Sequence, residues 1–172
     1  MVETVYLPYN EAEHREQFYE LNVEYLQWIR DEVTKRYGVD YRGRPSVRQY
    51  VESALPKFTN SKPPDVIVII LEVDGELAGM GAIRKLEESI AEIKRMYIRP
   101  MHRVRGYGSK MLHRLIDLAK DFGYSVLRLD TAEFMTAARH TYESTGFKVR
   151  GQYSGTELTD LQPYQIFMEK KQ

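Results

Sequence analysis

The spacing of apolar residues along the chain changes repeatedly between a helical and an extended period. Helical spacing predicts amphipathic helices over residues 14–33, 46–58, 108–122 and 135–144. Short apolar or alternating runs predict strands over residues 2–7, 66–73, 77–83, 89–98, 126–129, 147–153 and 164–169. The first strands form an antiparallel meander, and a β-α-β crossover over residues 89–129 predicts a locally parallel pair. The pattern therefore predicts an α/β chain with a mixed sheet.

Local signals mark several boundaries between these elements. Asp74-Gly75 separates two β-rich runs, as expected for a tight hairpin turn that needs positive φ. Ser46 and Gln49 match a capping box at a helix start, and Pro56 late in the same run predicts a kink or a stop.

The apolar set of residues 89–98 changes face along the strand. Ala91 and Ile93 share one parity, whereas Met96 and Ile98 share the other. A β-bulge between the two pairs would keep all four side chains on one face. A strand buried on both faces explains the same pattern equally well.

Length and composition narrow the class of protein. The chain has 172 residues, enough for one domain spanning 1–172, and its 25 basic and 25 acidic residues leave no net charge to attract nucleic acid or an anionic membrane. The absence of cysteine excludes disulfides and thiolate catalysis. The longest apolar run, residues 66–71, is too short to span a bilayer, and no signal peptide is recognised, so we expect a cytoplasmic protein.

No metal site is expected from the histidines. None of the four lies at metal-ligand spacing from another, and we interpret them as solvated: His14, His102, His113 and His140.

The most informative segment is RVRGYG at residues 103–108, between a predicted strand and a predicted helix. A helix N-terminus presents unpaired N–H groups and a partial positive charge, so it attracts phosphate. Gly106 and Gly108 allow an anionic group to approach the backbone, and Arg103 and Arg105 add positive charge. The segment predicts a pyrophosphate cradle.

Two other phosphate loops fit less well. A nucleoside-triphosphate loop needs Gly-Lys-Ser/Thr, whereas this chain has Gly108-Ser109-Lys110. A dinucleotide fold places an acidic residue at about the distance of Asp130, but its glycine loop follows the first strand of a β-α-β series and not an antiparallel meander.

Residues 91–108, AEIKRMYIRPMHRVRGYG, resemble the central motif of the GNAT superfamily of acetyl-CoA-dependent N-acetyltransferases. The signature [Q/R]-x-x-G-x-[G/A] is matched by Arg103, Gly106 and Gly108. Residues 138–147, ARHTYESTGF, resemble the family segment A-x-x-x-Y-E-x-x-G-F. The detailed resemblance covers residues 66–153. It implies a mixed, mostly antiparallel central sheet of about six to seven strands flanked by about four helices.

The resemblance implies acetyl-CoA as co-substrate and no metal. Backbone N–H groups of residues 104–109 would hold the pyrophosphate, and the strand end at residues 96–98 would pair with the pantetheine arm. The implied coenzyme-binding residues are Met96, Tyr97, Ile98, Arg103, Val104, Arg105, Gly106, Tyr107, Gly108 and Ser109. The chain departs from the family pattern at Val104, where many members have glycine, and at Met135, where many have an asparagine that contacts the coenzyme.

The resemblance also implies two catalytic side chains. Tyr142 matches the tyrosine that gives a proton to the leaving thiolate, with a packed tyrosine as the alternative. Glu92 matches a strand glutamate used as general base, with a salt bridge to Lys94 or Arg95 as the alternative. Weaker candidates for the base are Tyr97 and Glu133.

The implied acceptor is a primary amine on a small molecule, peptide or protein. Lys35, Arg36, Arg42, Arg44 and Arg48 cluster with only Asp40 near them, which suggests either an anionic acceptor or a solvated basic loop. Trp28, Tyr153 and Tyr164 suggest either an aromatic acceptor pocket or core packing. A homodimer stays open, since dimers are common among such proteins. The alternative function is a non-catalytic acyl-CoA-binding or regulatory module.

Overall fold

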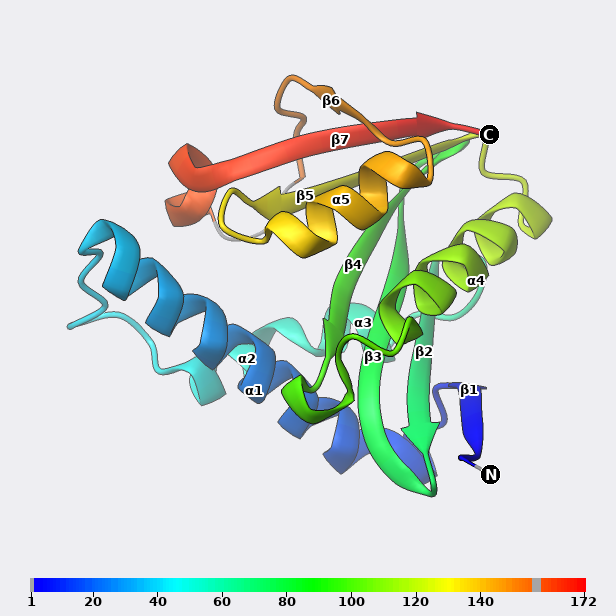
Figure 1. Ribbon diagram of the computed structural model, residues 1–172, viewed down its shortest axis with the longest axis horizontal. Helices are drawn as coiled ribbons and strands as arrows, with labels where there is room; N and C mark the ends of the chain where they lie inside the picture. The colour runs from blue at the N-terminus through cyan, green and yellow to red at the C-terminus, as the bar shows by residue number, and fades with distance from the viewer. Residues whose placement is uncertain (1, 156–158) are drawn as a thin grey trace.

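The computed structural model describes residues 2–155 and 159–172, which form one seven-stranded sheet in the order β1-β2-β3-β4-β5-β7-β6 (Figure 1). The strands are β1 (Thr4–Pro8), β2 (Val66–Val73), β3 (Glu76–Glu87), β4 (Ile90–Ile98), β5 (Val126–Ala132), β6 (Lys148–Arg150) and β7 (Gln165–Lys171). The helices are α1 (Glu11–Tyr37), α2 (Val47–Ala54), α3 (Pro56–Thr59), α4 (Tyr107–Asp121) and α5 (Thr136–Ser144), with 3₁₀ turns η1 (Pro100–His102) and η2 (Thr159–Tyr164).

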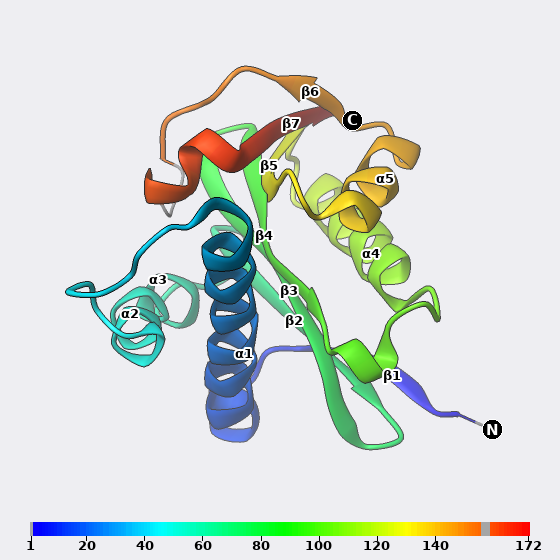
Figure 2. The same ribbon diagram turned by 60° about the vertical axis from the view of Figure 1, so that its left-hand side comes forward.

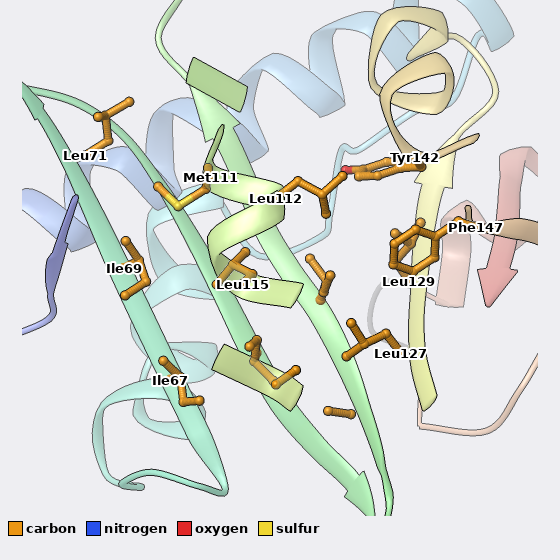
Figure 3. Close-up of a cluster of buried hydrophobic side chains, with 14 of the residues drawn as sticks. Ile67, Ile69, Leu71, Met111, Leu112, Leu115, Leu127, Leu129, Tyr142 and Phe147 are labelled. Atoms are coloured by element: carbon orange, nitrogen blue, oxygen red, sulfur yellow. The ribbon is translucent and has the colours of Figure 1, made fainter. Parts of the chain in front are cut away.

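Helices cover both faces of the sheet. Figure 2 shows α1, α2 and α3 on one face and α4 and α5 on the other. Figure 3 shows part of the core beneath α4, where Met111, Leu112 and Leu115 pack against β2 and β5. Phe18 and Phe58 anchor the core on the α1 face. Since both faces are covered, β2 is buried at seven of its eight positions, as its continuous apolar sequence requires.

The strand connections follow the sequence expectation. Strands β1 to β4 pair antiparallel in succession, and β4 pairs with β5 in parallel through the α4 crossover. Asp74 and Gly75 both have positive φ, 52° and 76°, in the hairpin between β2 and β3. The predicted mixed, mostly antiparallel sheet is confirmed, as are the capping box at Ser46 and the helix stop before Pro56.

Strand β4 contains the expected irregularity. Its register with β3 shifts between Met80 and Ala82, and Arg95 has a φ of +57°. The shift leaves Ile93 and Met96 packed on the α4 face despite their opposite parity. The predicted bulge is confirmed, and β4 is also buried on both faces.

The structure differs from the sequence expectations at three points. The strand predicted over 147–153 is only β6, because the chain leaves β7 after Arg150 and turns the Tyr153 side chain toward Glu92. The 3₁₀ turn η2 was not expected. Two histidines are buried rather than solvated: His14 lies in the first turn of α1 and accepts a hydrogen bond from the Asn10 amide, and His102 is enclosed in η1.

Within residues 2–155 and 159–172, no helix combines the length and the apolar character needed to cross a bilayer.

Candidate active site

The sheet splits between β4 and β5. The two strands pair at three positions only, ending with Glu92 opposite Arg128, and then diverge (Figure 1). Beyond that point the β4 edge faces a pocket of about 60 Å³ between the strands and α5. The pocket is lined by Tyr25, Ile93, Lys94, Arg95, Met96, Asp130, Thr131, Met135, Ala138 and Tyr142. An unpaired strand edge inside the molecule is a ready partner for an extended ligand.

A larger groove of about 710 Å³ lies elsewhere, between α1 and the α2–α3 segment. None of its lining residues belongs to either sequence motif. We therefore assign the candidate site to the smaller pocket at the split.

The loop after β4 forms an open helix start. Gly106 precedes α4 with a φ of +78°, and no side chain caps the helix. The first-turn N–H groups of Tyr107, Gly108 and Ser109 have no partner within an α-helix. A Cβ on Gly106 would meet no atom within 4 Å, so its conformation requires glycine while the space beside it is open. The geometry fits an anionic group at this position.

The conformations of Val104 and Arg103 are not those expected if this loop simply surrounded a phosphate with positive charge. Val104 is fully exposed and has a φ of +63°, a conformation that β-branched residues rarely adopt. The Arg103 Nε–H donates to the Ile98 carbonyl at 2.9 Å, and its guanidinium lies 5.1 Å from the centre of the Trp28 ring. Arg103 therefore directs its charge toward the aromatic residues on the α1 side.

The other residues expected to bind coenzyme are placed mainly by their backbone. Tyr107 is buried in the core, and its carbonyl accepts a hydrogen bond from the Tyr6 hydroxyl. Met96 and Ile98 pack toward α4, whereas Tyr97 is buried on the α1 face. Their contacts with a ligand in the split would be made by N–H and C=O groups of the strand.

Glu92 lies fully buried behind the pocket. Its Oε2 accepts a hydrogen bond from Arg84 at 2.6 Å, and its Oε1 accepts one from the Tyr153 hydroxyl at 2.8 Å. The Lys94 ammonium lies 3.4 Å from the same Oε1. Such pairing offsets the desolvation of a buried carboxylate. Glu92 is therefore held by three groups and does not line the pocket.

Asp130 is the carboxylate that faces the pocket. It lies on β5, two residues beyond the last position paired with β4. Lys94 Nζ is 2.5 Å from Asp130 Oδ1, and the Gln165 amide donates to Oδ2 at 2.8 Å. Lys94 thus joins Glu92 and Asp130 in a row that leads from the interior to the pocket wall.

Tyr142 also lines the pocket and lies on α5. Figure 3 shows its ring extending from α5 into the cluster beneath α4. Burial raises the pKa of its hydroxyl above the ordinary value, and the nearby Tyr25 and Asp130 raise it further. The phenol is therefore protonated at neutral pH, which is the form that can donate a proton.

The structure brings together some of the predicted residues and adds others. Tyr142 and Met96 line the pocket, whereas Glu92 is reached through Lys94. Glu133 is exposed near the Tyr37 hydroxyl. Lys94 and Asp130 had no assigned role at this site. The alternation of charged residues in EIK on β4 is the sequence feature that indicates Lys94 beside Glu92.

Two groups of residues were considered for binding the acceptor, one basic and one aromatic, and neither group is gathered at a single site. Arg36 pairs with Glu32, and Arg48 pairs with Glu20. Both acidic partners lie on α1, outside the segment in which the basic residues cluster. The three aromatic residues have separate neighbours: Trp28 contacts Phe134, Tyr153 contacts Phe167, and Tyr164 stacks on Tyr37.

In the part of the chain that the structure describes, no group of three or more His, Cys, Asp or Glu side chains is arranged to hold a metal ion.

Comparison with known proteins identifies the class to which this split sheet and helix start belong. The chain belongs to the acetyltransferase (GNAT) family, whose model matches residues 11–147, and it is therefore an acyltransferase by family.

Three individual relatives share a third or less of their aligned residues with this chain. The chain is 33% identical over 108 residues to the IAA acetyltransferase of Azospirillum brasilense, covering 62% of this chain and 69% of that protein. It is 30% identical over 118 residues to the N-acetylaspartate synthetase of Homo sapiens, covering 64% of this chain and only 39% of that protein. A solved structure of the PaiA N-acetyltransferase from Thermoplasma acidophilum in complex with coenzyme A shares the fold, with a TM-score of 0.65, 19% identity and coverage of 100% of this chain and 99% of that one.

Proposed function

We propose that this protein transfers the acetyl group of acetyl-CoA directly to a primary amine. The observation that carries the proposal is the split between β4 and β5, which opens beside Tyr142 on the strand that leads into the uncapped start of α4. The related fold with bound coenzyme A supports the same donor. The β4 edge would pair with the pantetheine arm, and the amides of residues 104–109 would bind the pyrophosphate.

The proposed reaction forms one bond and breaks one bond. The acceptor ammonium loses a proton, its nitrogen attacks the thioester carbonyl, and the C–S bond breaks as the C–N bond forms. Tyr142 donates a proton to the leaving thiolate and regains one from the nitrogen of the acetylated product. The base function is assigned to the carboxylate network that contains Glu92, acting through the groups in front of it.

A small-molecule acceptor is supported by the relatives. The name N-acetylaspartate synthetase describes acetylation of the amino group of an amino acid. Peptide and protein amines are the other acceptors to include in a panel.

The first test measures binding and turnover separately. Calorimetry with coenzyme A and acetyl-CoA should show binding, and thiol release from acetyl-CoA should require an amine from a panel of amino acids, polyamines and peptide N-termini. Binding without acceptor-dependent thiol release would favour the alternative function, a non-catalytic acyl-CoA-binding or regulatory module. Absence of coenzyme binding by well-folded protein would overturn both.

Replacement of the proposed acid gives a sharper prediction. Tyr142→Phe should lower kcat by about 10²–10⁴-fold while coenzyme A affinity is retained, because only the proton donor is removed. Tyr124→Phe is the matched control, since Tyr124 donates to the Pro64 carbonyl away from the split. Equal kcat values for Tyr142→Phe and the control would exclude Tyr142 as the acid.

A further inference from the structure

We propose that Asp130 is a further catalytic residue, the carboxylate that contacts the acceptor amine and takes its proton. The inference rests on the proposed acetyl transfer and assigns the proton-accepting step to one side chain. Glu92 then acts as a positioning residue behind Lys94.

Accessibility separates the two carboxylates. The Glu92 side chain is 0% exposed and is held by Arg84, Tyr153 and Lys94. The Asp130 side chain is 13% exposed and lines the pocket. A general base must lie within hydrogen-bond reach of the proton that it abstracts. Asp130 meets this condition for a molecule in the pocket, whereas Glu92 does not.

The hydrogen bonds of Asp130 leave room for a substrate. An ionised carboxylate accepts about four hydrogen bonds. The structure assigns one to Lys94 on Oδ1 and one to Gln165 on Oδ2. These contacts fix the plane of the carboxylate while each oxygen keeps an acceptor position for an ammonium group. A charge-assisted hydrogen bond from an ammonium to a carboxylate is stronger than one between neutral groups.

Asp130 and Tyr142 line one pocket from different elements. Asp130 comes from β5 and Tyr142 from α5, and β4 also lines the pocket. Burial raises the pKa of Tyr142, and the charge of Asp130 raises it further. A thioester bound in this pocket would therefore have both a proton acceptor and a proton donor among the lining residues.

The contacts of Lys94 give the buried Glu92 a positioning role. Lys94 contacts both carboxylates, with Nζ 3.4 Å from Glu92 and 2.5 Å from Asp130. Glu92 fixes Lys94, and Lys94 in turn fixes Asp130 at the pocket wall. The charged and titratable groups that line the pocket with Asp130 or interact with it are Lys94 and Arg95 from β4, Tyr25 from α1, Tyr142 from α5 and Tyr153 from the segment after β6.

The proton balance of the step is simple. Asp130 takes one proton from the acceptor ammonium before attack. After attack, the second nitrogen proton reaches the coenzyme sulfur through Tyr142, and Asp130 releases its proton to solvent when the product leaves. No oxidant, metal or covalent acyl-enzyme is required.

The test compares Asp130→Asn with Asp117→Asn, an exposed change of the same kind on α4. Asp130→Asn should lower kcat/KM for the amine by about 10²–10⁴-fold and replace the acidic limb of the wild type by the rise that deprotonation of the amine itself causes, with coenzyme A affinity unchanged. Asp117→Asn should match the wild type. An acidic limb retained in Asp130→Asn, with kcat/KM near that of the wild type, would overturn the proposal.

Further variants separate catalysis from folding. Because Asp130→Asn removes the nearer of the two carboxylates that contact Lys94, the double variant Lys94→Gln/Asp130→Asn removes both charges of that pair; it should bind coenzyme A and still be inactive. Glu92→Gln should retain the acidic limb at reduced kcat, as expected of a positioning residue. Loss of the limb in Glu92→Gln but not in Asp130→Asn would assign the base to Glu92. A wild type without acceptor-dependent thiol release would refute the proposed function itself.

Discussion

At the scale of single residues, two backbone conformations determine the loop that leads into α4. Gly106 adopts a φ of +78° at no steric cost, whereas Val104 adopts +63° with a β-branched side chain that contacts solvent alone. A left-handed conformation costs an ordinary residue roughly 1–2 kcal/mol. The strain at Val104 is thus retained beside the helix start that would bind the pyrophosphate, as strained residues often are at functional sites.

Val104→Gly should therefore stabilise the protein. Relief of roughly 1–2 kcal/mol of strain is partly offset by about 0.5–1 kcal/mol of extra backbone entropy in the unfolded chain. Urea unfolding should show a midpoint equal to or above that of the wild type. Val149→Gly, at another exposed valine but in strand β6, should lower the midpoint. An equal decrease in both variants would contradict the strain at Val104.

The residues of the site were only partly predictable. Tyr142 and the loop at residues 103–108 lie in short motifs whose spacing is local, so the sequence was sufficient to single them out. Asp130 was weighed only for a dinucleotide fold. Its position at the pocket depends on where β4 and β5 separate, and its partner Lys94 is 36 residues away in sequence. Contacts between residues this far apart in sequence produce no periodic pattern that a single sequence could reveal.

At the scale of elements, β3 packs closely against the end of β4 that follows the bulge. A Cβ on Gly79 would lie 2.6 Å from the Tyr97 carbonyl oxygen and 2.7 Å from Ile98 Cδ1. Because the Tyr97 carbonyl belongs to the backbone of β4, it could avoid this contact only if the strand itself moved. Gly79 therefore allows β3 to approach the part of β4 that borders the split.

Gly79→Ala should disturb this part of the sheet. Overpacking of a well-packed site costs about 1–3 kcal/mol, and the displaced strand end should also weaken binding of coenzyme A. Thermal unfolding and calorimetry test the two effects. Gly151→Ala is the control, because its Cβ would meet no atom within 4 Å and its φ is not positive. Equal stability and affinity in the two variants would exclude a steric role for Gly79.

The elements with strong local signals were predicted and those without them were not. The Asp74-Gly75 pair correctly predicted a hairpin turn, and the parity change between Ile93 and Met96 correctly predicted a β-bulge. The length of β6 was overestimated, because the apolar pattern continues to Tyr153 although that residue contacts Glu92 instead of extending the strand. Tertiary contacts decide such boundaries.

At the scale of the whole molecule, buried tyrosines join the strands to the helices and segments that cover them. Burial raises the pKa of Tyr142, and burial together with the charge of Glu92 raises that of Tyr153. Both hydroxyls are therefore more readily ionised in the unfolded chain than in the folded protein. Their protonated forms contribute stability that is fully present below the ordinary tyrosine pKa of 10.0.

The free energy of unfolding should consequently fall as pH rises above 10. The unfolded state then binds fewer protons than the folded state, and each of the two tyrosines adds a slope of up to about 1.4 kcal/mol per pH unit. Urea unfolding at a series of alkaline pH values measures this slope. Tyr142→Phe combined with Tyr153→Phe should reduce it. An unchanged slope in the double variant would show that other groups cause the alkaline loss of stability.

The split sheet has one more consequence. An unpaired strand edge on an outer surface invites other polypeptides to add to the sheet and aggregate. The free edge of β4 instead faces a pocket of about 60 Å³ closed on its far side by α5. The fold thus keeps a stretch of backbone available for pairing, while α5 and β5 on the other side of the pocket protect it from self-association.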